Sequence, residues 1–272
     1  MAVAGLAGRA YENDPALLAH VIGSGARTSV GLRGQAAASV LPEPADRSIP
    51  KPSEEEAGAP PGLAPVIVAP SQQFTFTGTQ VTPDGRTVPV TWSPCRPLHY
   101  VINTAGSPEG FTDHVAAAMA DLSAATGLRF VADGTTAELP VAPRTNFQPQ
   151  RYGDRWAPVL IAFSNAHMLP ALAGNVAGIG GYGSAQDRTT GVLVAVTGDV
   201  YLDSAVLAQP DVRGLPAYLP VLRHELGHLV GLDHIDDRTQ LMNPSTGSVT
   251  TYQGGDRTGL AQLGRGGCAP GL

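Results

Sequence analysis

The spacing of apolar residues divides the chain into a patterned C-terminal part and an N-terminal part with little pattern. Between residues 73 and 92, apolar side chains alternate with polar ones on both sides of the turn sequence Pro83-Asp84-Gly85. Alternation with a period of two is typical of a half-buried strand, so this segment predicts a β-hairpin. Uniformly apolar runs predict further strands over residues 98–102, 128–131, 158–163, 191–197 and 199–202, the last two joined at Gly198.

Apolar residues at helical spacing predict three helices in the same part of the chain. The first spans residues 111–127, with Thr112 as its N-cap and Gly127 as its end. The second begins between residues 216 and 220, because proline is tolerated only in the first turn of a helix. The third is short and is capped by Asp256.

The order strand, helix, strand, strand, strand and helix predicts an α+β domain, in which a mixed, twisted sheet carries two main helices. Between the strands, residues 178–183 read Gly-Ile-Gly-Gly-Tyr-Gly. This run is too rich in glycine for the interior of a strand, so we expect a loop. Two interpretations stay open: a flexible rim of a substrate cleft, or a solvent loop without a role in binding.

The N-terminal part differs from the rest in composition. Gly, Ala, Ser and Pro dominate from residue 23 to residue 70, around an acidic run at Glu54 to Glu56. Such a composition predicts a linker or a disordered prosegment, preceded by a short helix over residues 11–22. We therefore expect a disordered region over residues 1–70 and a globular domain over residues 71–272.

Charge and hydropathy narrow the classes of partner. The chain has 272 residues, a formal net charge of −6 and no cluster of Lys or Arg, which argues against nucleic acid or an anionic membrane as a partner. No apolar run approaches the ~18–20 residues of a transmembrane helix. We expect a soluble monomer. The first ten residues lack the basic and long apolar regions of a secretory signal.

One stretch of eleven residues, which begins at His224, has the form H-E-x-x-H-x-x-G-x-x-H. Two histidines four positions apart lie on one face of a helix, so His224 and His228 can bind a single metal ion. Glu225 lies one residue round from that face, close to where a general base would act on a metal-bound water. Gly231 can adopt the left-handed conformation that ends a helix, which would bring His234 back as a third ligand.

The sequence Leu-Met-Asn-Pro follows this stretch at residues 241–244. Together the two motifs resemble the zinc site of the metzincin metalloendopeptidases, and within them the matrixin-like group, in which a turn carrying a methionine lies beneath the zinc. The resemblance makes His224, His228 and His234 the zinc ligands. It makes Glu225 the catalytic base and Met242 the methionine of the turn.

The resemblance also implies a fold and an activity. The expected fold is a metzincin-like catalytic domain with a zinc-site helix and a small C-terminal subdomain that carries the methionine turn. The expected activity is that of a zinc-dependent endopeptidase with one catalytic Zn²⁺, in which Glu225 activates a zinc-bound water and a protein or peptide substrate binds in extended form. Such peptidases act outside the cell, so we expect a secreted protein whose export route stays open. The alternative is a non-catalytic binding module that contains zinc.

Two cysteines, Cys95 and Cys268, bracket most of the predicted domain. Their even number favours a disulfide, which would indicate an oxidising compartment. In a rival interpretation, Cys95 is the cysteine switch that keeps matrixin zymogens latent, although the order of its neighbours departs from that pattern. Calcium binding stays open, because no clear motif joins the clustered acidic candidates Asp154, Asp187, Asp199 and Asp203.

Overall fold

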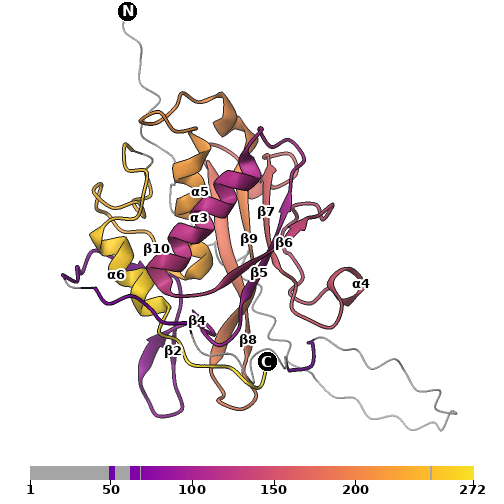
Figure 1. Cartoon of the computed structure of the whole chain (residues 1–272), viewed down its shortest axis with the longest axis vertical. Helices are drawn as coiled ribbons and strands as arrows, with labels where there is room; N and C mark the ends of the chain where they lie inside the picture. The colour runs from indigo at the N-terminus through magenta and orange to yellow at the C-terminus, as the bar shows by residue number, and fades with distance from the viewer. Residues whose placement is uncertain (1–48, 53–61, 68, 246) are drawn as a thin grey trace, which may run out of the picture.

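The computed structural model describes residues 49–52, 62–67, 69–245 and 247–272. The helix predicted over residues 11–22 and most of the region predicted to be disordered lie outside the described residues. The described part of the chain has an α+β fold, with a mixed sheet and few helices (Figure 1). None of the described helices is long and apolar enough to cross a membrane.

Six strands form the main sheet, in the order β4-β9-β7-β5-β6, with β8 paired to β9. The pairs are parallel except for β8 and β9, which run antiparallel. Among the described strands β8 pairs with β9 alone, so it forms an edge of the sheet. The bounds of these strands are Thr91–Trp92 (β4), Leu98–Asn103 (β5), Phe130–Thr135 (β6), Val159–Ser164 (β7), Gly178–Gln186 (β8) and Leu193–Asp203 (β9).

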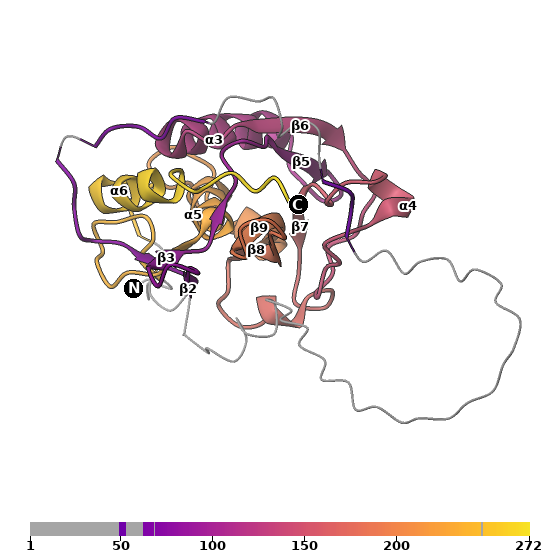
Figure 2. The same cartoon turned by 90° about the horizontal axis from the view of Figure 1, so that it is seen from below.

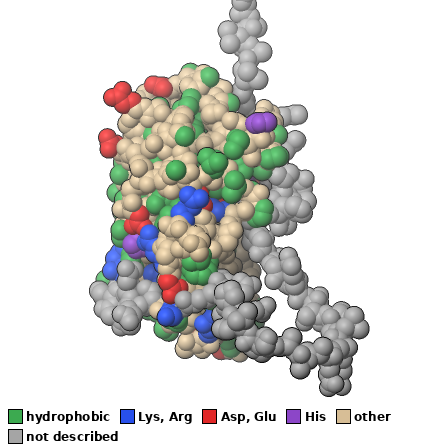
Figure 3. Space-filling view, turned by 90° about the vertical axis from the view of Figure 1, so that its right-hand side faces the viewer, with side chains coloured by type: hydrophobic (Ala, Val, Ile, Leu, Met, Phe, Trp, Pro, Cys, Tyr) green, Lys and Arg blue, Asp and Glu red, His purple; other side chains and the backbone are tan. Residues whose placement is uncertain are grey.

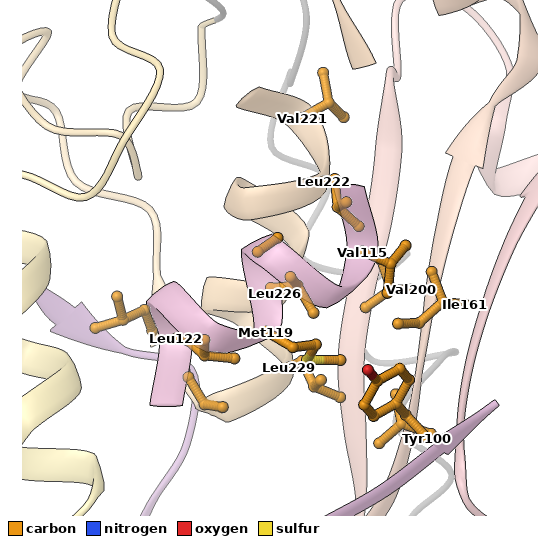
Figure 4. Packing of buried hydrophobic residues seen from close by; sticks show 14 of the residues in the cluster. Tyr100, Val115, Met119, Leu122, Ile161, Val200, Val221, Leu222, Leu226 and Leu229 are labelled. Carbon is orange, nitrogen blue, oxygen red and sulfur yellow. The ribbon is translucent and has the colours of Figure 1, made fainter. Parts of the chain in front are cut away.

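Helices α3 (Phe111–Thr126) and α5 (Tyr218–Val230) pack on one face of this sheet, and α6 (Gly254–Leu263) packs against these two helices (Figure 2). The apolar residues of α5 form one stripe at helical spacing, and they meet α3 and the sheet in a single core (Figure 4). Burial of each leucine in this core contributes about 1.5–3 kcal/mol. The residues of the core drawn in Figure 4 include Tyr100, Val115, Met119, Leu122, Ile161, Val200, Leu222, Leu226 and Leu229.

Loops cover the opposite face of the sheet, together with the short helices α4 (Pro149–Tyr152) and η1 (Pro170–Leu172), whereas η2 (Ser204–Ala208) contributes Val206 to the core beneath α3 and α5. A buried ion pair holds the loop between β6 and α4, because Arg144 donates to both carboxylate oxygens of Glu138, at 2.8 and 2.9 Å. Figure 3 views the molecule from the side of α4 and shows basic, acidic and apolar side chains interspersed over that surface.

The hairpin prediction is confirmed only for its centre. Strands β2 (Thr79–Val81) and β3 (Thr87–Pro89) pair antiparallel around the predicted turn. The flanking residues are recruited elsewhere, since β1 (Thr75–Phe76) pairs with β10 (Leu232–Asp233) and β4 joins the main sheet. Period-two alternation predicts a strand but does not identify its partner, so the predicted hairpin of residues 73–92 is longer than the observed one.

Two predicted helix caps are wrong by a few residues. Helix α3 begins one residue earlier than Thr112, after Gly110 at a positive φ of 76°, because buried Phe111 anchors its first turn. Helix α6 is capped by Gln253. Asp256 is the third residue of the helix and forms a capping box with Gln253. Its carboxylate accepts the backbone N–H of Gln253 at 2.8 Å.

Two predictions about glycines in the sheet are also wrong. Residues 178–183 lie inside strand β8 rather than in a loop, and residues 193–203 form one strand through Gly198 rather than two. The physical reason is close packing. A Cβ atom at Gly198 would lie 2.4 Å from the carbonyl oxygen of Gly181 and 2.4 Å from Cδ1 of Leu229 on α5. The glycines provide room for a helix on these strands, not a turn between them.

The predicted disulfide between Cys95 and Cys268 is present, with a separation of 173 residues along the chain. It attaches a C-terminal tail, in which Ala269 and Leu272 are buried, to the segment before β5. A disulfide-bonded Cys95 is not a zinc-binding switch, so the rival interpretation of this residue is wrong for this structure.

Removal of this disulfide should destabilise the fold. We expect Cys268→Ser to lower the free energy of unfolding by about 2–5 kcal/mol, because the disulfide closes a long loop and so restricts the conformations of the unfolded chain. Urea unfolding under non-reducing conditions measures this difference. Reduced wild-type protein should lose a similar amount, and equal stability of the oxidised and reduced wild type would contradict the prediction.

Candidate metal centre

The motif of three histidines lies on α5 and in the turn that follows it. His224 and His228 stand one turn apart on the helix. The helix ends at Gly231, whose φ of 114° lies in the left-handed region that suits glycine. The chain then forms β10, which pairs with β1, and His234 follows directly. The structure thus confirms the turn at Gly231 that the sequence predicts.

The three imidazoles converge on one point. Their Nε2 atoms form a triangle in which each side, from His224 to His228, from His224 to His234 and from His228 to His234, measures 3.1 Å. A zinc ion binds imidazole nitrogen at about 2.0–2.1 Å, and an ion at that distance from all three atoms fits above a triangle of this size. Among the described residues, this is the one group of three or more His, Cys, Asp or Glu side chains that could hold a metal ion.

Hydrogen bonds made by Nδ1 fix the tautomers of His224 and His228. His224 donates from Nδ1 to the carbonyl oxygen of Leu241 at 2.8 Å, and His228 donates from Nδ1 to that of Leu232 at 2.8 Å. A neutral imidazole has one N–H, so the facing Nε2 atoms of these residues carry lone pairs rather than protons. Two lone pairs directed at each other repel unless a cation lies between them. This arrangement is the one expected of metal ligands oriented by backbone carbonyls.

The histidines are also kept neutral. Burial lowers the pKa of all three imidazoles, and neighbouring histidines lower those of His224 and His234 further, to about 3 for His234. At neutral pH the three rings are therefore unprotonated and ready to bind a cation without first releasing a proton.

Glu225 lies between α5 and the edge strand β8, and its exposed fraction is 1 %. A Cβ atom at Gly178 would lie 2.8 Å from Cγ and 3.0 Å from Oε1 of Glu225. A Cβ atom at Gly180 would lie 2.2 Å from the backbone oxygen of Glu225. The glycines of β8 thus make room for this carboxylate and its helix. Sequence reasoning missed this contact, because it joins segments far apart in the chain.

An alanine at this contact should disturb it measurably. We expect Gly180→Ala to cost about 1–3 kcal/mol of folding free energy, because its methyl group would overlap the backbone of α5. Gly181→Ala is the matched control, because a Cβ atom there meets nothing within 4 Å. Urea unfolding of both variants compares them directly, and equal losses of stability would contradict the close packing of α5 on β8.

The turn that contains Met242 is fixed beneath the histidines. Met242 is buried, and a Cβ atom at Gly227 would lie 2.5 Å from its sulfur. The backbone N–H groups of Leu241 and Met242 donate to the carboxylate of Asp256 at 2.8 and 3.2 Å. Asp256 therefore connects α6 with this turn, and through the carbonyl of Leu241 with His224. The sequence identified Asp256 only as a helix cap.

The other candidates lie apart from this centre. The four aspartates considered for calcium do not form a three-residue ligand group among the described residues. Two of them act locally, since Asp187 accepts the N–H groups of Thr189 and Thr190 at 2.9 and 2.6 Å, and Asp203 caps η2. Comparison with protein-family models and with curated proteins found no match to this chain.

Proposed function

We propose that this protein is a zinc-dependent endopeptidase of the matrixin-like metzincin type. The proposal rests on one observation: three histidines, of which His224 is buried and the other two are half-buried, direct their Nε2 atoms at a single point, and buried Glu225 follows His224 directly on α5. Zinc held by three protein ligands keeps a position open for water, whereas structural zinc sites usually have four protein ligands, often cysteines. Both cysteines of this chain are joined to each other, which favours the catalytic type of site.

The residues of the site supply the proton transfers of peptide hydrolysis. A zinc ion at this point would polarise the scissile carbonyl and lower the pKa of a water molecule towards ~7. Glu225 accepts a proton from the attacking water and passes it to the nitrogen of the leaving amine. The Nδ1 hydrogen bonds of His224 and His228 keep their rings aimed at the site, and Asp256 holds the turn that provides one of the two acceptors.

Strand β8 is the surface that suits the substrate. An extended peptide adds to the free edge of a sheet through main-chain hydrogen bonds, and β8 is such an edge among the described strands. Gly178 and Gly180 of β8 contact Glu225, so a peptide paired with this part of the strand would pass next to the catalytic base. The disulfide favours an oxidising compartment, and we place the activity outside the cell.

Metal analysis tests the proposal. Purified protein should contain about one zinc per chain, as a single site with three ligands implies. A chelator should abolish hydrolysis of an unfolded protein substrate, and added zinc should restore it. Undiminished hydrolysis by thoroughly demetallated protein would contradict the proposal.

A further inference from the structure

A cavity lies apart from the residues of the metal centre. Its volume is about 400 Å³, and it is lined by the starts of strands β5, β7 and β9, by the tryptophans Trp92 and Trp156, and by the segment Pro50–Pro52. None of the three histidines, Glu225 or Met242 contributes to its wall. Figure 2 shows the segment 49–52 beside the C-terminus, on the side of the sheet opposite to α5.

The segment Ile49-Pro50-Lys51-Pro52 comes from the N-terminal region and is seated against this cavity. Pro50 is buried and Ile49 is half-buried, while the two residues that follow are exposed. The backbone N–H of Lys51 donates to the carboxylate of Asp154 at 3.3 Å, across 103 residues of sequence. This contact therefore places part of the N-terminal region on the domain.

The chemistry of the segment matches that of the cavity. Proline has no N–H, so the four residues offer four carbonyl acceptors but only two backbone donors, one of which Asp154 satisfies. On the cavity side, the indole N–H of Trp156 is buried and has no acceptor among the described residues. Neither indole donates to the segment, because that of Trp92 is bonded to the carbonyl of Leu229, so the match lies in the aromatic walls, against which proline-rich, extended peptides pack in the grooves that bind them.

We propose that the other residues lining this cavity form a groove that receives the chain's own segment Ile49–Pro52, which anchors the N-terminal region on the face of the sheet opposite to α5. The anchor is separate from the metal centre, because none of the residues assigned to that centre lines the cavity. The inference does not depend on the proposed peptidase activity, because it uses neither the histidines nor Glu225.

The two tryptophans of the chain both line this groove, so intrinsic fluorescence reports on it selectively. Pro50→Asp introduces a charge at the buried position of the segment. In the full chain, this variant should raise the acrylamide quenching constant of tryptophan about twofold, because release of the segment exposes Trp156. Pro44→Asp is the matched control, since it makes the same change at a proline of the N-terminal region that is not part of the segment Ile49–Pro52.

Two further arms make the test specific. Trp156→Phe should remove the difference between Pro50→Asp and wild type, because Trp92 is buried and its indole is bonded to the carbonyl of Leu229 at 2.9 Å. A synthetic peptide covering residues 46–53 should restore protection to the Pro50→Asp chain, and the same peptide with Asp in place of Pro50 should not. Zinc content and thermal midpoint should match those of wild type.

Equal quenching in wild type, Pro50→Asp and Pro44→Asp would overturn the proposal. A twofold rise of the quenching constant in Pro44→Asp as well would also overturn the proposal, because the effect would then come from the added charge and not from the position of Pro50. Failure of the wild-type peptide to protect the Pro50→Asp chain at millimolar concentration would exclude recognition of this segment by the groove.

Discussion

Replacement of Glu225 with Gln should lower the rate of peptide hydrolysis by at least ~10²–10⁴-fold, the range typical of the loss of a general base. Glutamine keeps the size of the side chain, which lies against Gly178, but it accepts no proton. Zinc content and thermal midpoint should stay close to those of wild type, because Glu225 is not one of the three converging ligands. Turnover of an unfolded protein substrate at saturating concentration measures the change in kcat.

The matched control is Glu109→Gln, which makes the same chemical change at an exposed glutamate. It should leave turnover within about twofold of wild type, as expected of a surface substitution. Comparable turnover of wild type and Glu225→Gln would exclude Glu225 as the base. Loss of zinc from Glu225→Gln would instead show that this carboxylate is needed to build the metal site.

Replacement of His234 with Ala should remove the third ligand and with it most of the affinity for zinc. Loss of a residue that merely supports a ligand costs about 10–100-fold in metal affinity, so loss of a ligand should cost at least ~100-fold. Competition with a chromophoric chelator measures this change. Hydrolysis should fall with zinc occupancy.

Stability provides an independent readout of the same variant. A ligand present at 1,000 times its dissociation constant stabilises a fold by about 4 kcal/mol, so zinc should raise the thermal midpoint of wild type and should raise that of His234→Ala much less. His167→Ala is the control, because His167 is exposed and lies outside the group of three histidines. Equal zinc-dependent stabilisation of all three proteins would contradict the assignment of His234 as a ligand.

The group of three histidines was predictable because its geometry is local. Two histidines four positions apart on a helix must share a face, and a glycine three residues later supplies the left-handed turn that returns the chain. These relations depend on spacing within eleven residues. The disulfide was predictable for a different reason, since a chain with two cysteines allows only one pairing.

The support of the site was not predictable in the same way. The glycines of β8 predicted a loop by composition, yet they form an edge strand because α5, about forty residues later, packs directly on them. Asp256 predicted a helix cap, and its second role becomes visible only when α6 is placed beside the turn at Met242. Both errors have one cause, since composition describes local preference whereas these residues serve contacts between distant elements.

The measurement that tests the central claim most directly is cleavage of a broad peptide library by the zinc-loaded full chain, with the products identified by mass spectrometry. The account predicts internal cleavage of extended peptides, which a chelator abolishes and which Glu225→Gln reduces by at least ~10²-fold. Wild-type protein that contains one zinc per chain but cleaves no peptide in the library would contradict it, and would favour a binding module that contains zinc.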